Sequence, residues 1–348
     1  MFLLPFSEFN MLRHKGILRT MLTSVMIVMI FGRMLIFDPG GGILIINQRM
    51  GWVENVRTRI ILEPDICGSE DVAVIIHSHA NNSLIRSSQR KALKENNLKP
   101  VFVVFKSDSV KTEKLEEESL LYADLLVGEM QESYYNLIYK HVMALRWMNN
   151  NCPDNIVIKM DDDIYVNFPS MLEVVNKNIP DHNPDWMMGL LQLRLPVLRS
   201  ETASKWSVSH QDWSEDVYPD FLSGWCYIAS SSAVRNIVLQ MEAEDSLFWI
   251  DDVMITGVVA DRAGVERISL NSYFTVHKKI MDCCTEATDE EECGYLVGPT
   301  DGNIALLDSL VRKQKVCRRT ESCKAASKCT IQNPFFSLQT AVGEVIPV

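Results

Sequence analysis

Hydrophobic and polar positions define two alternating kinds of segment in the middle of the chain. Short apolar runs at 72–77, 101–105 and 156–160 have the length and the β-branched content of buried strands. Longer segments at 84–96 and 132–149 lie between them, and the second carries apolar residues at helical spacing. Strands that alternate with helices predict an α/β fold with a mainly parallel sheet.

The pattern is less regular after the third apolar run. Residues 186–193 predict another strand, whereas 230–241 and 248–260 predict helices, the first with a serine as N-cap. Residues 206–227 are rich in aromatic and polar side chains. No internal repeat is evident.

Three carboxylates follow the apolar run at 156–160: Asp161, Asp162 and Asp163. Side chains alternate along a strand, so Asp161 and Asp163 are expected to point the same way and Asp162 the opposite way. Ligands of parallel α/β sheets bind at the carboxyl ends of strands, where this triplet falls. The triplet predicts a Mg²⁺ or Mn²⁺ site shared with substrate phosphates. A solvated acidic turn is the alternative, although adjacent charges repel each other unless a cation neutralises them.

An apolar span at 21–37 follows three basic residues, Arg13, Lys15 and Arg19. Positive charge before such a span places the N-terminus in the cytosol, which predicts a type II signal anchor. Arg33 interrupts the span near its end, where a long side chain could snorkel to the interface. The alternative is a cleaved signal peptide, whose apolar region is about 7–15 residues long and ends at small residues. Either way, the chain is expected in the secretory pathway.

The net charge and the cysteine content limit the classes of protein to which the chain can belong. A net charge of −11 over 348 residues argues against a nucleic-acid binder, because no basic excess neutralises phosphates. The sequon Asn81-Asn82-Ser83 would be usable only in the lumen. The tail spacings are mostly wider than those of zinc sites, so we expect disulfides, with one thiol unpaired because the total of nine is odd. Six of the cysteines crowd into the tail, at Cys283, Cys284, Cys293, Cys317, Cys323 and Cys329.

A set of short motifs occurs in order between about Val74 and His277. They are Ile76-His77-Ser78, Arg86 with Arg90, Tyr122-Ala123-Asp124-Leu125-Leu126, the run from Glu132 to Lys140, Trp147, Cys152, Lys159-Met160-Asp161-Asp162-Asp163, Tyr218-Pro219, Ser223-Gly224-Trp225-Cys226-Tyr227 and Asp251-Asp252-Val253. Together they resemble the β-1,3-galactosyltransferase family, which also includes the Fringe proteins. An isolated Asp-x-Asp would be weak, but the ordered set is specific.

The chain departs from the family pattern at several places. Ala92-Leu93 stands where the family commonly has Thr-Trp, and Trp225-Cys226 stands where glycines usually follow Ser-Gly. The family's Glu-Asp-Val is Asp251-Asp252-Val253 here, which keeps the charge and shortens one arm. The change at Trp225 could alter the choice of acceptor. The cysteine-rich tail after Asp282 has no counterpart that the resemblance covers.

The resemblance implies a GT-A fold, a UDP-sugar donor and a Mn²⁺ or Mg²⁺ cofactor. The leaving nucleoside diphosphate needs a cation that bridges its oxygens. Asp163 is the implied direct metal ligand, Asp161 shares the metal or holds the ribose, and His277 completes the shell unless it is a structural histidine. The donor-binding candidates are Arg86, Arg90, Lys159, Asp161, Asp162 and Gly224.

Several of these candidates also have a structural interpretation. Arg86 and Arg90, one helical turn apart, either stabilise the donor or pair with a neighbouring acidic segment. Lys159 either offsets phosphate charge or packs, because neighbours on a strand face alternate sides. Asp162 is expected on the nucleotide side or the backbone side. The candidates for stacking on a sugar are Trp213, Trp225 and Trp249, although aromatic residues in such folds are mostly core.

Inverting transfer needs a base that takes the proton of the attacking sugar hydroxyl. The resemblance assigns this role to Asp252. The sequence alone favours a helix N-cap or a first-turn charge for Asp251-Asp252. The predicted reaction moves a hexose or N-acetylhexosamine from a UDP-sugar to a glycoprotein or glycolipid acceptor in β-1,3 linkage.

We expect a single-pass type II protein of the Golgi membrane with a lumenal catalytic domain. Its predicted parts are a cytosolic tail (1–20), a signal anchor (21–37), a stem (38–70), a glycosyltransferase domain (71–281) and a cysteine-rich extension (282–348). The sequence leaves open the donor sugar, the acceptor, the disulfide pairing and whether the chain forms a homo-oligomer.

Two other functions compete with this one. An aspartyl phosphatase also places Asp-x-Asp after an apolar strand, but it normally has Thr or Val two residues beyond the second Asp, where this chain has Tyr165. The non-enzymatic alternative is a family member without turnover that acts as a lumenal glycan-binding or chaperone subunit. The intact Asp161, Asp163 and Asp252 argue against that loss, whereas the altered region at Trp225 leaves it open.

Overall fold

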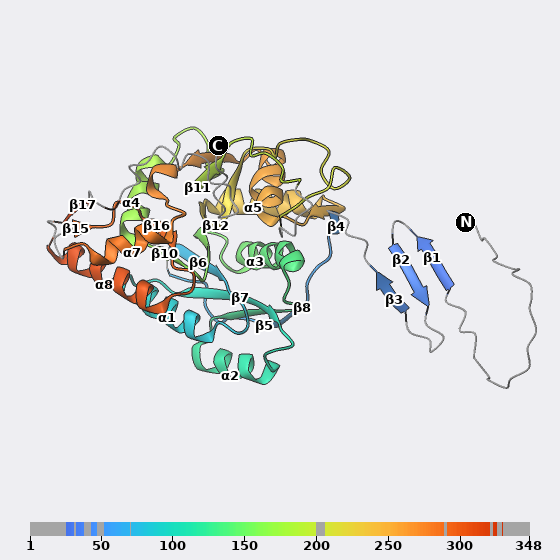
Figure 1. The fold of residues 1–348 in the computed structure, drawn as a ribbon, viewed down its shortest axis with the longest axis horizontal. Coiled ribbons are helices and arrows are strands. Elements are labelled where there is room, and N and C mark those ends of the chain that lie inside the picture. Colours follow the sequence, from blue (N-terminus) through green and yellow to red (C-terminus); the bar gives the residue numbers. More distant parts are fainter. Residues whose placement is uncertain are drawn as a thin grey trace, which may run out of the picture. The chain divides into compact units, whose positions relative to one another are not determined.

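Two units make up the chain (Figure 1). The computed structural model describes residues 26–30, 33–37, 43–46, 52–69, 71–199, 206–288, 291–320, 323–325 and 329. Residues Met1–Met50 form one unit and Gly51–Val348 the other. The candidate site lies within the second unit.

The first unit contains an antiparallel sheet with the strand order β1-β2-β3 (Met26–Ile30, Arg33–Phe37 and Ile43–Ile46). The structure does not support the predicted membrane helix over 21–37 where it describes that segment, because β1 and β2 are extended and paired with each other. Residues 21–25 and 31–32 lie outside the described residues. An apolar run containing isoleucine and valine suits a strand as well as a helix, so periodicity could not decide. Among the described residues, no helix has the length and apolar character needed to span a bilayer.

An eight-stranded sheet forms the centre of the second unit, with the order β14-β11-β12-β9-β6-β7-β8-β5. Strands β6 to β9 are parallel, β12 is antiparallel to both of its neighbours, and β5 is antiparallel to β8. The predicted α/β fold and the four predicted strands are confirmed. The bounds are β5 Ile60–Leu62, β6 Val72–His77, β7 Pro100–Lys106, β8 Leu125–Gln131, β9 Ile156–Asp161, β11 Trp186–Gln192, β12 Phe221–Ala229 and β14 Glu266–Ser269.

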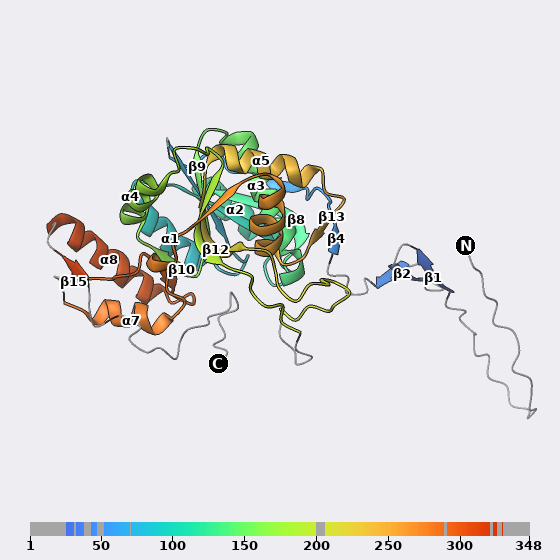
Figure 2. The same cartoon turned by 90° about the horizontal axis from the view of Figure 1, so that it is seen from above.

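Helices cover both faces of this sheet (Figure 1, Figure 2). Alternate strand residues enter two separate cores, so Ile75 belongs to one and Val74 to the other. The first core also includes residues of α3 (Leu137–Asn151), α5 (Ser231–Glu242) and the π-helix η2 (Val253–Val259). The second includes residues of α1 (Ser83–Lys94), α2 (Thr112–Tyr122) and α4 (Phe168–Asn178).

Shorter elements complete the second unit. Strand β4 (Trp52–Glu54) pairs with β13 (Ser246–Phe248), and β5 belongs to the central sheet, so the predicted stem over 38–70 is folded into this unit from Trp52 onwards. The remaining helical segments are η1 Tyr134–Asn136, α6 Ala260–Arg262, η3 Asn271–Tyr273, α7 Lys278–Glu286 and α8 Ile304–Thr320. The other paired strands are β10 Ile164–Val166 with β16 Val297–Pro299, and β15 Glu291–Glu292 with β17 Lys324–Ala325.

The predicted disulfides are confirmed. One links Cys67 to Cys152 across the catalytic region, and three lie in the tail: Cys283–Cys329, Cys284–Cys293 and Cys317–Cys323. The odd thiol is Cys226 in β12, which is buried. Because α8 packs against α1, the cysteine-rich extension is attached to the sheet domain.

Candidate active site

The aspartate triplet lies at the carboxyl end of the central parallel strands. Asp161 is the last residue of β9 and is paired with His77, the last residue of β6. Asp162 and Asp163 form the turn that follows, so the alternation of a strand does not extend to them. Asp162 is nevertheless buried, while Asp161 is half-buried and Asp163 exposed.

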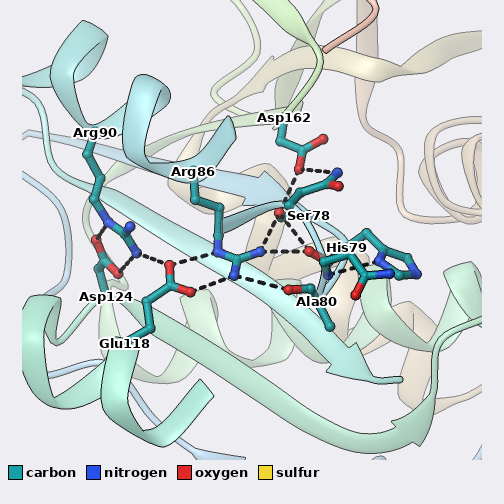
Figure 3. Close-up of polar contacts among 10 residues, drawn as sticks. Ser78, His79, Ala80, Arg86, Arg90, Glu118, Asp124 and Asp162 are labelled. Atoms are coloured by element: carbon teal, nitrogen blue, oxygen red, sulfur yellow. Dashed lines mark hydrogen bonds and ion pairs between the residues drawn. The ribbon is translucent and has the colours of Figure 1, made fainter. Parts of the chain in front are cut away.

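The buried carboxylate of Asp162 holds the loop that follows β6 (Figure 3). Its Oδ2 accepts hydrogen bonds from Ser78 Oγ at 2.6 Å and from Asn82 Nδ2 at 3.0 Å. Gln89 Nε2 donates to the carbonyls of Asp162 and Ile164 at 2.9 and 2.8 Å. Burial raises the pKa of Asp162, and the two hydrogen bonds oppose that rise. These contacts match the backbone-side alternative for Asp162, and its donor-binding role stays a prediction.

Arg86 is fully buried, and each of its five N–H groups has a partner within the protein (Figure 3). Nε and Nη2 bind the carboxylate of Glu118 at 2.9 and 2.6 Å. The other N–H groups donate to Ser78 Oγ and to the carbonyls of His79 and Ala80. With its charge paired and all of its donors used within the protein, Arg86 has the contacts of the ion-pair interpretation, and its donor-binding role stays a prediction.

Arg90 repeats this arrangement one helical turn later. Its Nε and Nη2 bind Asp124 at 2.7 and 2.8 Å, and Nη2 also binds Glu118 at 2.7 Å. Its guanidinium lies over the ring of Tyr122, 3.9 Å from the centroid. Burial acts to lower the pKa of Arg90, but the bonds from Asp124 and Glu118 raise it overall. Arg90 therefore makes the ion pairs of the alternative interpretation, and its donor-binding role stays a prediction.

Lys159 connects the aspartate triplet to the neighbouring strand β12. Its side chain is only 1% exposed, and Nζ donates to Asp161 Oδ1 at 2.7 Å and to the carbonyl of Gly224. The N–H of Gly224 in turn donates to Asp252 Oδ2 at 3.3 Å. A Cβ at position 224 would lie 3.0 Å from the Cβ of Asp252, which explains why the chain has glycine there. These contacts join Asp161, Lys159, Gly224 and Asp252 into one connected group.

Asp252 immediately precedes η2 and also caps it, because its Oδ1 accepts a hydrogen bond from the N–H of Val253 at 2.9 Å. Burial raises the pKa of Asp252 to about 7, and the charge of the adjacent Asp251 adds to the rise. A carboxyl group that is half-ionised near neutral pH is suited to accept a proton from a sugar hydroxyl. The N-cap interpretation and the base interpretation are thus compatible.

The sequence did not predict one buried residue next to this site, His141. His141, on α3, contacts both Asp251 and the hydroxyl of Tyr227. The apolar stripe of α3 predicts core positions only, and a single histidine inside it carries no signal of its own. Only the three-dimensional contact with Asp251 identifies it.

Asp163 and His277 are the remaining metal-ligand candidates. Asp163 is an exposed residue, but nearby protein atoms partly desolvate its carboxyl group. This desolvation, together with the negative charges of Asp161 and Asp162, raises the pKa of Asp163 to about 7. A divalent cation would relieve that repulsion, and carboxylate oxygens suit Mn²⁺ or Mg²⁺, so the triplet fits a metal. His277 precedes α7, and burial lowers its pKa, which favours the neutral ring that metals bind. Within the described residues, no three His, Cys, Asp or Glu side chains are gathered around one point as for a metal ion.

The three tryptophans predicted as sugar platforms differ in position. Trp249 is 5% exposed and belongs to the core. Trp225 packs edge-on against Phe274, with ring centroids 5.7 Å apart. Trp213 packs against Phe248, with ring centroids 5.1 Å apart, and also lines an open pocket.

Comparison with known protein families shows to which family the chain belongs. A family model described as galactosyltransferase matches residues 83–271, which is more than half of the chain and includes the triplet, Lys159, Gly224 and Asp252. The chain belongs to the galactosyltransferase family. The predicted resemblance is confirmed, because relatives of the chain are named β-1,3-galactosyltransferases and β-1,3-N-acetylglucosaminyltransferases.

Three relatives illustrate how far the similarity extends. Lactosylceramide 1,3-N-acetyl-β-D-glucosaminyltransferase of Xenopus tropicalis is 26% identical over 59% of this chain and 58% of its own length. The Homo sapiens protein of that name is 26% identical over 49% of this chain and 46% of its own length. β-1,3-Galactosyltransferase 5 of Pan paniscus is 27% identical over 58% of this chain and 67% of its own length. The chain thus spans between about half and two thirds of these relatives.

Two solved structures of glycosyltransferases show low similarity to the chain. One is a glycosyltransferase involved in the glycosylation of the major capsid of PBCV-1, with a TM-score of 0.36, 10% identity and coverage of 70% of this chain and 99% of that one. The other is mouse xyloside xylosyltransferase 1 in its apo form, with a TM-score of 0.27, 9% identity and coverage of 59% and 87%.

Proposed function

We propose that this member of the galactosyltransferase family transfers a hexose or N-acetylhexosamine from a UDP-sugar to a glycan hydroxyl. The linkage formed is β-1,3, and the anomeric configuration is inverted. The observation that carries the proposal is the connected group Asp161–Lys159–Gly224–Asp252. It places a carboxyl group with a pKa of about 7 beside the acidic end of a central strand, which is the juxtaposition that base-assisted displacement of a diphosphate requires.

In the proposed reaction the acceptor oxygen attacks the anomeric carbon of the donor sugar. A bond forms between that oxygen and the carbon, the bond from the carbon to the diphosphate breaks, and UDP leaves with the electron pair. The proton of the acceptor hydroxyl passes to the ionised carboxylate of Asp252. The N–H groups of Gly224 and Val253 fix the two oxygens of that carboxylate, so its orientation is set before the acceptor arrives.

Lys159 and the triplet serve the departing diphosphate in this scheme. The ammonium of Lys159 is buried next to Asp161 and contributes fixed positive charge at the strand end. A Mn²⁺ or Mg²⁺ ion, when bound, would supply Lewis-acid stabilisation of the diphosphate oxygens. Asp163 and Asp161 would hold it, with His277 as a third ligand. Asp162 and Arg86 keep the loop after β6 in place near these residues, and Arg90 shares Glu118 with Arg86.

The acceptor and the compartment belong to the same proposal. Relatives named for action on lactosylceramide suggest a lactose-terminated acceptor, carried on a glycolipid or a glycoprotein. Four disulfides support an oxidising compartment, for which we propose the Golgi lumen. The GT-A classification is also part of the proposal, and the mixed sheet with its acidic strand end supports it.

Activity of the purified full chain with lactose tests the proposal. UDP release is measured with UDP-galactose, UDP-N-acetylglucosamine and UDP-N-acetylgalactosamine in the presence of Mn²⁺, and the product linkage is assigned by NMR. We expect one donor to be consumed with formation of a β-1,3 bond. Failure of all three donors to bind or react would favour the glycan-binding or chaperone alternative.

A further inference from the structure

A second recess lies beside the far end of η2. It is an open pocket of about 850 Å³, lined by residues of the segment before β12, the end of η2 and the start of β14. None of Asp161, Asp163 and Asp252 lines it. The pocket is therefore distinct from the strand end at which the donor is proposed to react.

The lining combines apolar and charged residues. Trp213, Tyr218 and Val258 contribute apolar surface, whereas Asp220 and Arg262 are among the charged residues. Sugars present flat C–H faces that pack on aromatic rings, and they also present hydroxyl groups that both donate and accept hydrogen bonds. A lining with both positively and negatively charged side chains suits a neutral, hydroxyl-rich ligand better than an anion such as a nucleotide.

The hydroxyl of Tyr218 gives an independent indication of a ligand. The residue is only 5% exposed, and among the described residues its Oη has no hydrogen-bond partner. A buried hydroxyl left unsatisfied costs about 1–3 kcal/mol, so such groups normally have a partner. Tyr218 is one of the residues that line the open pocket, and we infer that a polar group of a bound molecule is the partner of its hydroxyl.

The pocket is close to the proposed base. Asp252 lies at the first turn of η2 and Val258 near its last residue, so they are less than roughly 10 Å apart along the helix axis. Tyr218 also lies within the electrostatic reach of Asp252: burial raises the pKa of Tyr218 most, Arg199 opposes the rise, and Asp252 adds to it. η2 packs closely against β12, because a Cβ on Gly257 would approach the Cβ of Phe221 to 3.2 Å.

We propose that this pocket binds a neutral sugar of the acceptor chain that does not itself react, one or two residues from the sugar that does. The inference rests on the proposed transferase function, since only that function defines an acceptor. The pocket would make an extended oligosaccharide a better acceptor than a disaccharide. Trp213 would stack on the sugar, and Tyr218 would donate or accept a hydrogen bond with one of its hydroxyls.

Acceptor length provides the kinetic test. KM and kcat are measured for lactose and for the tetrasaccharide lacto-N-neotetraose with the wild-type chain and three variants. We expect the wild type to have the lower KM for the tetrasaccharide. Tyr218→Phe should raise that KM about fivefold and Trp213→Ala about tenfold or more, with kcat and the KM for lactose nearly unchanged. Tyr139→Phe is the matched control, because it removes a hydroxyl that bonds to the Glu54 carbonyl outside the pocket.

Binding without a donor separates the pocket from the reaction. Saturation-transfer NMR with lacto-N-neotetraose should show contact with the wild-type chain and reduced contact with the Trp213→Ala and Tyr218→Phe variants. Binding that depends on these residues in a chain that transfers no sugar would refute the proposed function and leave the pocket as a saccharide site. Equal KM values for the two acceptors in the wild type, or no loss of binding in either folded variant, would overturn the inference.

Discussion

His141 Nδ1 lies 2.8 Å from Asp251 Oδ2, and the other ring nitrogen lies 2.6 Å from the hydroxyl of Tyr227. Burial lowers the pKa of His141, so the ring is neutral at pH 7. A carboxylate can only accept, which places the proton on Nδ1 and makes Tyr227 the donor to Nε2. Burial acts to raise the pKa of Asp251, but the bond from His141 outweighs it and keeps Asp251 ionised beside Asp252. Asp251 stands where the family has a glutamate, and the ring of His141 bonds to this shorter side chain.

We predict that His141→Ala destabilises the fold by about 2–4 kcal/mol, because it leaves the buried carboxylate of Asp251 and the Tyr227 hydroxyl without a partner. Urea unfolding monitored by tryptophan fluorescence measures the change. His182→Ala is the control, since His182 is exposed and pairs with Glu266 at the surface. A His141→Ala variant as stable as the control would show that this network contributes little.

Asp252 should control the pH dependence of transfer. Its pKa of about 7 means that the carboxyl is mostly protonated, and unable to accept a proton, below that pH. The transfer rate should therefore fall as the pH drops through about 7 and level off above about 8. The pH profile of kcat with saturating donor and acceptor measures this.

The companion variant isolates the base from the binding of the nucleotide. Asp252→Asn should lower kcat by at least about 100-fold, whereas calorimetry should find UDP bound as tightly as by the wild type. Asp154→Asn, at an exposed position, serves as the matched control. A variant that loses UDP affinity instead of turnover would move Asp252 from the reaction to the donor site.

The sequence predicts the strands that carry the site better than it predicts the contacts between the site residues. Apolar runs locate the buried strands, and the run at 156–160 correctly places the triplet at a strand end. Strand β12 escapes prediction because Ser223-Gly224 interrupts its apolar character, and β12 is the strand that carries Gly224 to Asp252. Pairing of β9 with β12 is a long-range contact, which no local periodicity encodes. The ion pair between Arg86 and Glu118 likewise depends on where α2 packs, and the spacing of Arg86 and Arg90 along the chain does not encode it.

Arg86 offers a direct test of its structural role. Because its charge is buried and paired with Glu118, Arg86→Ala should cost about 3–5 kcal/mol of stability. Glu118→Gln should also destabilise the fold, and the double variant should lose less than the sum of the two, as residues in one network do. Arg57→Ala removes an exposed pair with Glu242 and should cost less than about 1 kcal/mol. Additive effects at Arg86 and Glu118, measured by urea unfolding, would contradict the coupling.

The disulfides should differ in their contribution according to the loop that each closes. Cys67–Cys152 spans 85 residues and Cys317–Cys323 only 6, so chain entropy alone gives about 4–5 kcal/mol for the first and about 2 kcal/mol for the second. Replacing each pair by serines and comparing thermal unfolding measures the difference. A larger loss from the tail pair would mean that native contacts, and not loop closure, set the order.

Metal removal tests the role of the triplet. Three adjacent carboxyl groups at one strand end repel one another, and only Asp161 has a cationic partner, Lys159, among the contacts described here. A divalent ion is thus expected to interact most with Asp163, whose side chain is exposed. Treatment with EDTA should abolish transfer, and Mn²⁺ should restore it in the wild type. Asp163→Ala should require at least about tenfold more Mn²⁺ for half-maximal activity and should retain UDP more weakly. An Asp163→Ala variant with the wild-type Mn²⁺ titration would exclude Asp163 as a ligand and leave Asp161 and His277 to be tested in the same way.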